Sequence, residues 1–248
     1  MVEILVVLSL IGGFVAAHEI GFWLGSATRS KDEAFDRQVA LVRTSTAALV
    51  AFLVGFAFSG AASRAMNRQD MVVKEANALR TAYLRADTIA EPQRGELKAA
   101  LKEYTADRAT LLSREGHDQI EALLAKVTGL HDRMWTPAIK ASQNNAQLMA
   151  VVLPPINEVI ELHTAHLAMA RRHLPIPIMA VLMATAAISI GIIGFGNGRV
   201  GRRFSVIDSV YGVILAAALW MTIDLDYPAI GMIGVSNRPI VEALAAMS

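Results

Sequence analysis

The chain has no cysteine, almost no net charge and none of the short motifs of soluble enzymes. The absence of cysteine among its 248 residues excludes disulfide bonds, thiolate metal sites and a thiol nucleophile. A formal net charge of +1 gives no overall field that would attract nucleic acid, so we expect no nucleic-acid partner. The sequence contains no Gly-x-Ser-x-Gly elbow, phosphate-binding loop or dinucleotide fingerprint in a suitable context. We therefore predict that the protein is not an enzyme and needs no cofactor.

Hydrophobic residues make up 54% of the chain and are concentrated in four long blocks. The blocks cover approximately residues 3–24, 44–62, 174–195 and 204–223. A helix rises about 1.5 Å per residue, so each block can cross the roughly 30 Å of hydrocarbon in a bilayer. The first block begins without the basic segment of a secretory signal, which favours a spanning helix. The sequence thus predicts an all-α membrane protein with four transmembrane helices, surrounded by the lipid bilayer of the cell membrane.

The segment between the second and third blocks, residues 63–173, is different because its charges are dense and balanced. Apolar residues recur there at helical spacing, as at Leu97, Leu101 and Tyr104, and strand alternation is absent. We predict a helical extramembrane domain whose first and last helices continue the adjoining membrane helices as stalks. The residues expected to divide this domain into four or five helices are Pro92, Gly116, Pro137 and the pair Pro154-Pro155.

The predicted organisation has four parts. Residues 1–62 hold the first two spans and a polar connection, which is either a loop or a short amphipathic helix. Residues 63–173 form the helical domain, residues 174–224 the last two spans, and residues 225–248 an irregular tail that ends in a short helix. Four spans place both termini and the helical domain on one side of the membrane. Lys and Arg are almost equally numerous on the two sides, so the positive-inside rule leans only weakly toward cytoplasmic loops.

Four separated segments of the sequence resemble one protein family. They are Phe52–Ser59 in the second span, Val72–Ala86 after it, Leu153–His163 before the third span, and Ile223–Ser236 in the tail. Together, and in this order, they resemble the bacterial bestrophin-like domain membrane proteins, from about residue 45 to the end of the chain. For a bacterial source this resemblance implies the inner membrane.

The resemblance extends, more distantly, to bestrophin anion channels. It implies a pentamer with four spans per subunit and a large helical region between spans two and three. In bestrophins this region lies in the cytosol. The distribution of Lys and Arg in this chain weakly favours the opposite, an external domain. The resemblance also implies that span two lines the pore.

The second span carries the residues that match the bestrophin constriction. Its Phe-x-x-Gly-Phe stretch is formed by Phe52, Gly55 and Phe56, and the span has no charged residue. Phe52 and Phe56 share one helix face, where they would form a hydrophobic gate or pack against lipid or a neighbouring helix. Gly55 and Ser59 belong to a stripe of small residues that predicts helix packing within or between subunits.

Charged residues near the end of span two and after span four are further candidates. Arg64 and Arg68 follow span two by about one and two turns and could supply positive potential at a pore mouth. Bestrophins hold calcium with a run of acidic residues after the last span. Directly after span four, in residues 224–236, only Asp224 and Asp226 are acidic, so we do not expect calcium gating.

Three ionisable residues fall within the spans. His18 and Glu19 lie in the second half of span one, and Asp208 lies near the start of span four. Such groups are costly in a bilayer and usually functional, although His18 and Glu19 could also lie at the interface. For Asp208 we expect charge neutralisation by Arg202 or Arg203.

The segment before span three contains residues that bind metals in other proteins: Glu158, Glu161, His163 and His166. Their spacing fits neither the His-Glu-x-x-His pattern nor the Glu-x-x-His pattern of di-iron bundles. We therefore predict a charged, solvated helix face and no metal site.

These observations support two hypotheses of function. The first is a homo-oligomeric, pentameric bestrophin-like ion channel with span two lining the pore, and with chloride preferred over cations by resemblance. The alternative is a non-conducting membrane scaffold or sensor whose helical domain binds a partner. Oligomer size distinguishes them, because a channel needs a ring of second spans around an axis.

Overall fold

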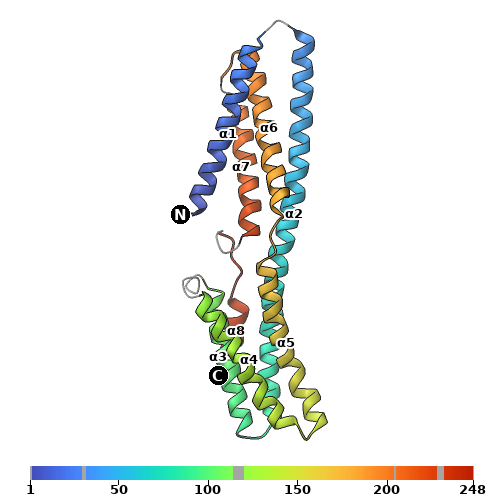
Figure 1. The fold of residues 1–248 in the computed structure, drawn as a ribbon, viewed down its shortest axis with the longest axis vertical. Helices are drawn as coiled ribbons and strands as arrows, with labels where there is room; N and C mark the ends of the chain where they lie inside the picture. The colour runs from blue at the N-terminus through green and yellow to red at the C-terminus, as the bar shows by residue number, and fades with distance from the viewer. Residues whose placement is uncertain (1, 30–31, 114–119, 204, 228–231, 248) are drawn as a thin grey trace. The chain divides into compact units, whose positions relative to one another are not determined.

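The computed structural model of the chain describes residues 2–29, 32–113, 120–203, 205–227 and 232–247. Every regular element in these ranges is a helix (Figure 1). The chain divides into two compact units. We call Met1–Ala65 with His173–Gly234 the membrane unit, and Met66–Arg172 with Val235–Ser248 the polar unit. Each unit is described by itself.

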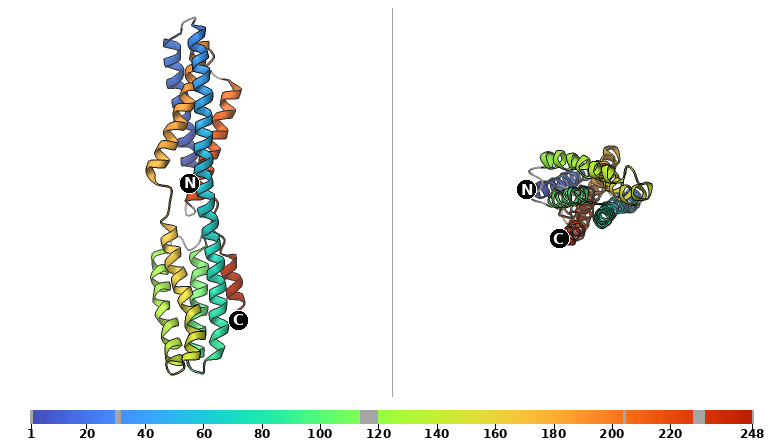
Figure 2. Two further views of the ribbon diagram at one scale, coloured as in Figure 1. Left: turned by 90° about the vertical axis from the view of Figure 1, so that its right-hand side faces the viewer. Right: turned by 90° about the horizontal axis from the view of Figure 1, so that it is seen from below.

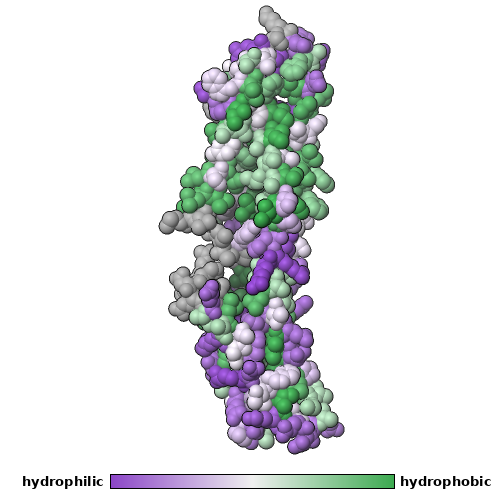
Figure 3. All heavy atoms as spheres, viewed as in Figure 1, coloured by the Kyte–Doolittle hydropathy of each residue, from purple (hydrophilic) through white to green (hydrophobic). Residues whose placement is uncertain are grey.

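The membrane unit contains α1 (Val2–Ala27), the first part of α2 (Glu33–Arg85), α6 (Ile176–Val200) and α7 (Val206–Asp226), side by side in Figures 1 and 2. Within the described residues, these four helices are long and apolar enough to cross a membrane, as the sequence predicts. Their shared core includes Phe14, Val50, Leu182 and Leu219. Most other apolar side chains point outward and give this unit the hydrophobic surface of Figure 3, which suits contact with lipid.

The closest helix contact in the membrane unit joins α1 and α6 through glycine. A Cβ atom added at Gly21 would collide with the carbonyl oxygen of Gly191, and one added at Gly194 would collide with that of His18. Gly25 and Gly198 are equally confined. Because only hydrogen fits at these positions, the two backbones approach each other directly, as small-residue pairs allow in membranes.

The polar unit contains the rest of α2, the short 3₁₀ helix η1 (Ala86–Thr88), α3 (Gln93–Leu111), α4 (Ile120–Ser142), α5 (Ala146–Ala170) and α8 (Arg238–Ala245). α3 packs against α4, α4 against α5, and α8 against α3 (Figure 2). The core of this unit includes Leu79, Leu101 and Met134. The Tyr83 hydroxyl donates a hydrogen bond to the Met247 carbonyl at 2.8 Å, so the end of the tail belongs to this unit.

The helix breaks predicted at Pro137 and at Pro154-Pro155 are wrong, because these prolines lie inside α4 and α5. Pro155 has no N–H to donate to the Val151 carbonyl one turn earlier. The Arg85 guanidinium donates to that carbonyl instead, at 2.9 Å, which replaces the missing helical hydrogen bond.

The observed break between α4 and α5 lies at residues 143–145. It is fixed by Asn145, whose Oδ1 atom accepts hydrogen bonds from the amides of Gln147 and Leu148 at 3.0 and 3.1 Å. An asparagine in this position satisfies donors that the first turn of a helix leaves unpaired. α5 therefore starts at a cap rather than at a proline.

One of the two predicted stalks is continuous in the structure and the other is interrupted. α2 runs without a break from Glu33 to Arg85, and it also takes up much of the polar connection after span one. In contrast, α5 ends at Ala170 and α6 begins at Ile176, so the prediction of a continuous helix there is wrong. Pro175 favours extended backbone at Leu174, the residue before it, so α5 and α6 cannot join into one helix.

Candidate functional site

The pore and gate candidates lie together on one exposed face of α2. Phe52, Gly55, Phe56 and Ser59 recur at helical spacing, and we call this surface the Phe52 face. The exposed fractions of Phe52 and Phe56 are 70% and 73%. Only 11% of the most apolar 18-residue window of α2 is buried, against 22–28% for the other three spanning helices. The chain itself thus leaves the Phe52 face uncovered.

Gly55 makes no helix contact within the described part of its own chain. A Cβ atom added there would meet no heavy atom within 4 Å, and Ser59 is exposed as well. The prediction that this small-residue stripe packs within the subunit is therefore wrong for Gly55. Packing between subunits stays a prediction.

The two arginine candidates do not lie on the Phe52 face. A helical turn of about 100° per residue places Arg64 and Arg68 roughly 120° and 160° away from Phe52. Arg64 donates from Nε to Oδ1 of Asp226 at 2.7 Å, and Arg68 is 5% exposed. The positive charge of Arg64 is thus offset within its own unit, and neither side chain adds an exposed cation beside the phenylalanines.

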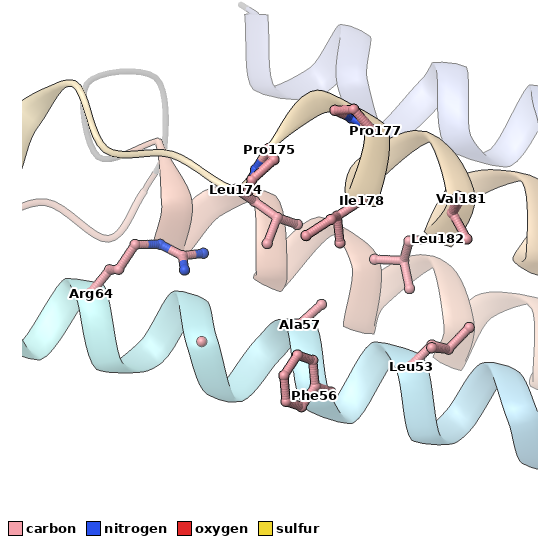
Figure 4. A pocket seen from close by; sticks show the side chains of 11 residues that line it. Leu53, Phe56, Ala57, Arg64, Leu174, Pro175, Pro177, Ile178, Val181 and Leu182 are labelled. Carbon is pink, nitrogen blue, oxygen red and sulfur yellow. The ribbon is translucent and has the colours of Figure 1, made fainter.

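A pocket of about 520 Å³ lies between α2 and the start of α6. Leu53 and Phe56 contribute to its lining from α2, and Figure 4 shows Ile178 and Leu182 pointing toward that helix. The lining is almost entirely apolar, with Arg64 at one end. The pocket extends the apolar surface beside Phe56 and contains no arrangement of side chains for chemistry.

The intramembrane residues form a polar network instead of separate sites. The side-chain Nδ2 of Asn197 donates to Oδ2 of Asp208 at 2.8 Å and lies 3.3 Å from Nε2 of His18. Arg43 of α2 donates to the other oxygen of Asp208 and neutralises it. His18 is 8% exposed, so it lies inside the helix bundle rather than at its surface.

The predicted ion pair of Asp208 with Arg202 or Arg203 is wrong, because Arg203 forms an ion pair with a different carboxylate. Its Nη2 atom lies 2.8 Å from Oε2 of Glu19. The side chain of Arg203 is 59% exposed and that of Glu19 is 23% exposed. This ion pair is therefore partly accessible, as the interfacial alternative for Glu19 requires. Arg202 is exposed and is not the partner of Asp208 among the described ion pairs.

Comparison with known protein families gives one match, which covers almost the whole chain. The family model of the bestrophin-like domain matches residues 12–240. The chain belongs to the bestrophin-like family. A search of curated proteins finds no match.

Solved structures with this fold include bacterial bestrophin homologues from Klebsiella pneumoniae. A mutant of that homologue matches with a TM-score of 0.69 at 11% identity, over 97% of this chain and 95% of its own. A second structure, phased with zinc, matches with a TM-score of 0.65 at 12% identity, over 98% and 97%. At such low identity these structures show a shared fold only.

The two acidic residues expected after the last span lie in the final turn of α7, where they bind backbone amides of this bestrophin-like chain. Asp226 is fully buried and accepts a hydrogen bond from the Leu174 amide at 2.7 Å, in addition to the ion pair with Arg64. Asp224 accepts from the amide of Met232 at 2.6 Å. Both carboxylates therefore connect α7 to neighbouring segments of the chain.

The polar unit of the bestrophin-like chain contains a buried ion pair, Glu75 with Arg108, that was not predicted from the sequence. Both Nε and Nη2 of Arg108 lie 2.7 Å from the carboxylate of Glu75, to which the Tyr104 hydroxyl also donates at 3.0 Å. Burial raises the pKa of Glu75, but hydrogen bonds from Arg108 and His166 outweigh it and hold this pKa at about 2. The sequence did contain a signal for this ion pair. Arg108 follows Leu101 and Tyr104 at helical spacing, which places a charged residue on the apolar face of the helix.

The segment considered for metal binding is solvated in part only. Glu158 and Glu161 are exposed, as predicted, but only 2% of His163 is exposed. The prediction of a solvated position is therefore wrong for His163. The described residues contain no group of three or more His, Asp or Glu that could hold a metal ion. His163 lies instead beside the ring of His131, with ring centroids 5.0 Å apart.

Proposed function

We propose that this membrane protein is a homo-oligomeric ion channel in which the Phe52 face of α2 lines the pore. The observation that carries this proposal is the exposure of Phe52 and Phe56 on the least buried of the four spanning helices. Membership of the bestrophin-like family supports it, because bestrophins, which this chain resembles, are channels. A pentamer, and chloride as the preferred ion, follow from the same resemblance.

The chemistry of the face suits a hydrophobic constriction. Residues 44–62 contain no charge, and the two phenylalanines stand one turn apart on the same side of the helix. A ring of such faces around an axis would make a narrow apolar neck, which stops ions by dewetting until it widens. Anion preference needs a source other than Arg64, because Asp226 offsets its charge.

We further propose that the polar unit is the extramembrane domain. Its helices carry many exposed ion pairs, such as Arg133 with Glu103, which would be costly in hydrocarbon. Figure 3 shows a mainly hydrophilic surface over α3 and α4. The described end of the tail belongs to this unit through α8.

Ion flux from liposomes tests the channel. Replacement of both Phe52 and Phe56 by Ala should widen and wet the neck, so anion flux should exceed that of the wild type. A matched control replaces Val213 and Ile214 of α7 by Ala, since these side chains are equally apolar and exposed at 66% and 62%. The control should conduct like the wild type.

The outcome separates the two hypotheses of function. Equal flux from the Phe variant and the α7 control would remove the Phe52 face from the pore. If all three proteins insert as oligomers and none passes ions above empty liposomes, the channel proposal fails. The scaffold or sensor hypothesis, with a partner bound by the polar unit, would then take its place.

A further inference from the structure

A cluster of histidines lies in the core of the polar unit, outside the proposed pore. His131 comes from α4, and His163 and His166 come from α5. The rings of His131 and His163 meet edge to face, and each also contacts the ring of Tyr104. Tyr104 is completely buried.

Three of the four ring nitrogens of the two facing histidines are buried without a hydrogen-bond partner among the described residues, and His131 itself is half-buried. Neither ring nitrogen of the buried His163 has a hydrogen-bond partner there, and the same holds for Nε2 of His131. His166 differs, because its Nδ1 lies 3.0 Å from the Glu75 carboxylate. No such contact with a carboxylate is described for His163.

Burial, more than the charges around the cluster, opposes a further positive charge. α2 contributes the single buried carboxylate, Glu75, which already binds Arg108 of α3 in a bidentate ion pair. α3 also contributes Tyr104, and α4 contributes Asp132, which is exposed and next to His131. The charged residues of α8 are Arg238 and Glu242, which are exposed and pair with each other.

We propose that protonation of His131 and His163 in mildly acidic solution opens the polar unit, which makes this unit a pH-sensitive element of the protein. The packed core excludes two additional cations beside Arg108, while an opened core would let water solvate them. Opening would therefore take up protons.

The sign of the effect follows from the direction of the pKa shifts. Burial, together with the positive charge of Arg108, lowers the pKa of His163 to about 4, and burial also lowers the pKa of His131. An opened core returns both to the ordinary value of about 6.5. The opened unit then binds more protons than the closed one between pH 6.5 and about 4, so stability is full above this window and falls within it. For each extra proton that the opened unit binds, the equilibrium constant for closing falls by up to about tenfold per unit decrease in pH.

Hydrogen exchange of the full-length protein in lipid nanodiscs tests this proposal. Peptides from α3 and α4 should be protected at pH 7.5. At pH 5 their protection, corrected for the intrinsic exchange rate, should fall at least about tenfold and recover when neutral pH is restored. Peptides from α1 and α6 of the membrane unit serve as the internal reference and should keep their protection.

Two variants separate the histidines from other causes. His131→Phe combined with His163→Phe keeps two aromatic rings and removes both titrations, so protection should no longer depend on pH. His173→Gln changes a histidine of the membrane unit and should respond like the wild type. If the double variant does not fold, His163→Gln alone should show a shallower pH dependence than the wild type. Equal protection of the wild type at both pH values, or an undiminished response in the histidine variants, would overturn the proposal.

Discussion

Asp226 illustrates how one carboxylate can hold several segments of this chain. It is fully buried at the end of α7, where Arg64 of α2 and the amide of Leu174 both bind it. The carbonyl of the same residue lies 3.0 Å from Nδ1 of His173. A buried carboxylate is stable only with such partners, and its partners depend on it in turn.

Replacement of Asp226 by Ala should therefore destabilise the membrane unit by about 3 kcal/mol, since Arg64 loses its counter-charge in a poorly hydrated position. Thermal unfolding in detergent would show this as a lower midpoint. Glu242→Ala is the matched control, because Glu242 forms an exposed ion pair with Arg238 on α8 and contributes little. Equal midpoints for the two variants would contradict the role assigned to Asp226.

At the scale of elements, glycine has opposite roles in two membrane helices. Gly194 of α6 packs directly against the backbone of α1, where an added Cβ atom has no room. Gly55 of α2 faces open space within its own chain. The same residue type is thus essential for packing at one position and free of intrachain contact at the other.

Alanine substitutions should separate these two roles. Gly194→Ala forces α1 and α6 apart and should cost about 1–3 kcal/mol, the usual penalty for overpacking. Gly55→Ala should leave the fold of the subunit intact or stabilise it slightly, because alanine favours a helix by about 1 kcal/mol over glycine. Unfolding midpoints of the two variants in detergent provide the comparison. A larger loss for Gly55→Ala would point to a helix contact in the assembled protein.

The sequence was sufficient to predict most elements whose signal is local, and it failed where distant segments decide. Four apolar blocks predicted four spanning helices, and unbroken helical spacing predicted that span two continues into the polar unit as one helix. The break before α5 was missed although its signal, the cap at Asn145, is local. In contrast, the arginine that compensates Pro155 comes from another helix, which no local pattern indicates.

The arrangement of the candidate site was predictable to a similar extent. Helical spacing alone places Phe52 and Phe56 on one face, but their exposure depends on which helices pack around α2. The ion pair between Arg64 and Asp226 joins residues far apart in the sequence, and no local pattern indicates it. The pattern Gly-x-x-x-Gly at Gly21 and Gly25 was a usable signal for the contact between α1 and α6.

At the scale of the whole molecule, the composition of the polar unit constrains the path of the chain through the membrane. This unit combines residues 66–172 with the tail from residue 235 onward. Within it, the side-chain Nδ2 of Asn237 donates to the Ala109 carbonyl at 3.1 Å. Two segments that fold into one unit lie on the same side of a bilayer. With the polar unit outside the membrane, as proposed, we expect the chain between them to cross an even number of times, which α6 and α7 together would satisfy.

Cysteine labelling can test this path, because the natural chain has no cysteine. Single cysteines replace Lys102 in α3 and Glu242 in α8 for one side, and Ala27 after span one and Arg202 after span three for the other. All four positions are exposed. In intact cells, a membrane-impermeant thiol reagent should label one pair and spare the other, and in inverted vesicles the pattern should reverse. Labelling that separates Lys102→Cys from Glu242→Cys would mean that α6 and α7 do not both cross the membrane. The side on which Lys102→Cys is labelled also decides between the cytosolic domain implied by the bestrophin resemblance and the external domain favoured weakly by the loop charges.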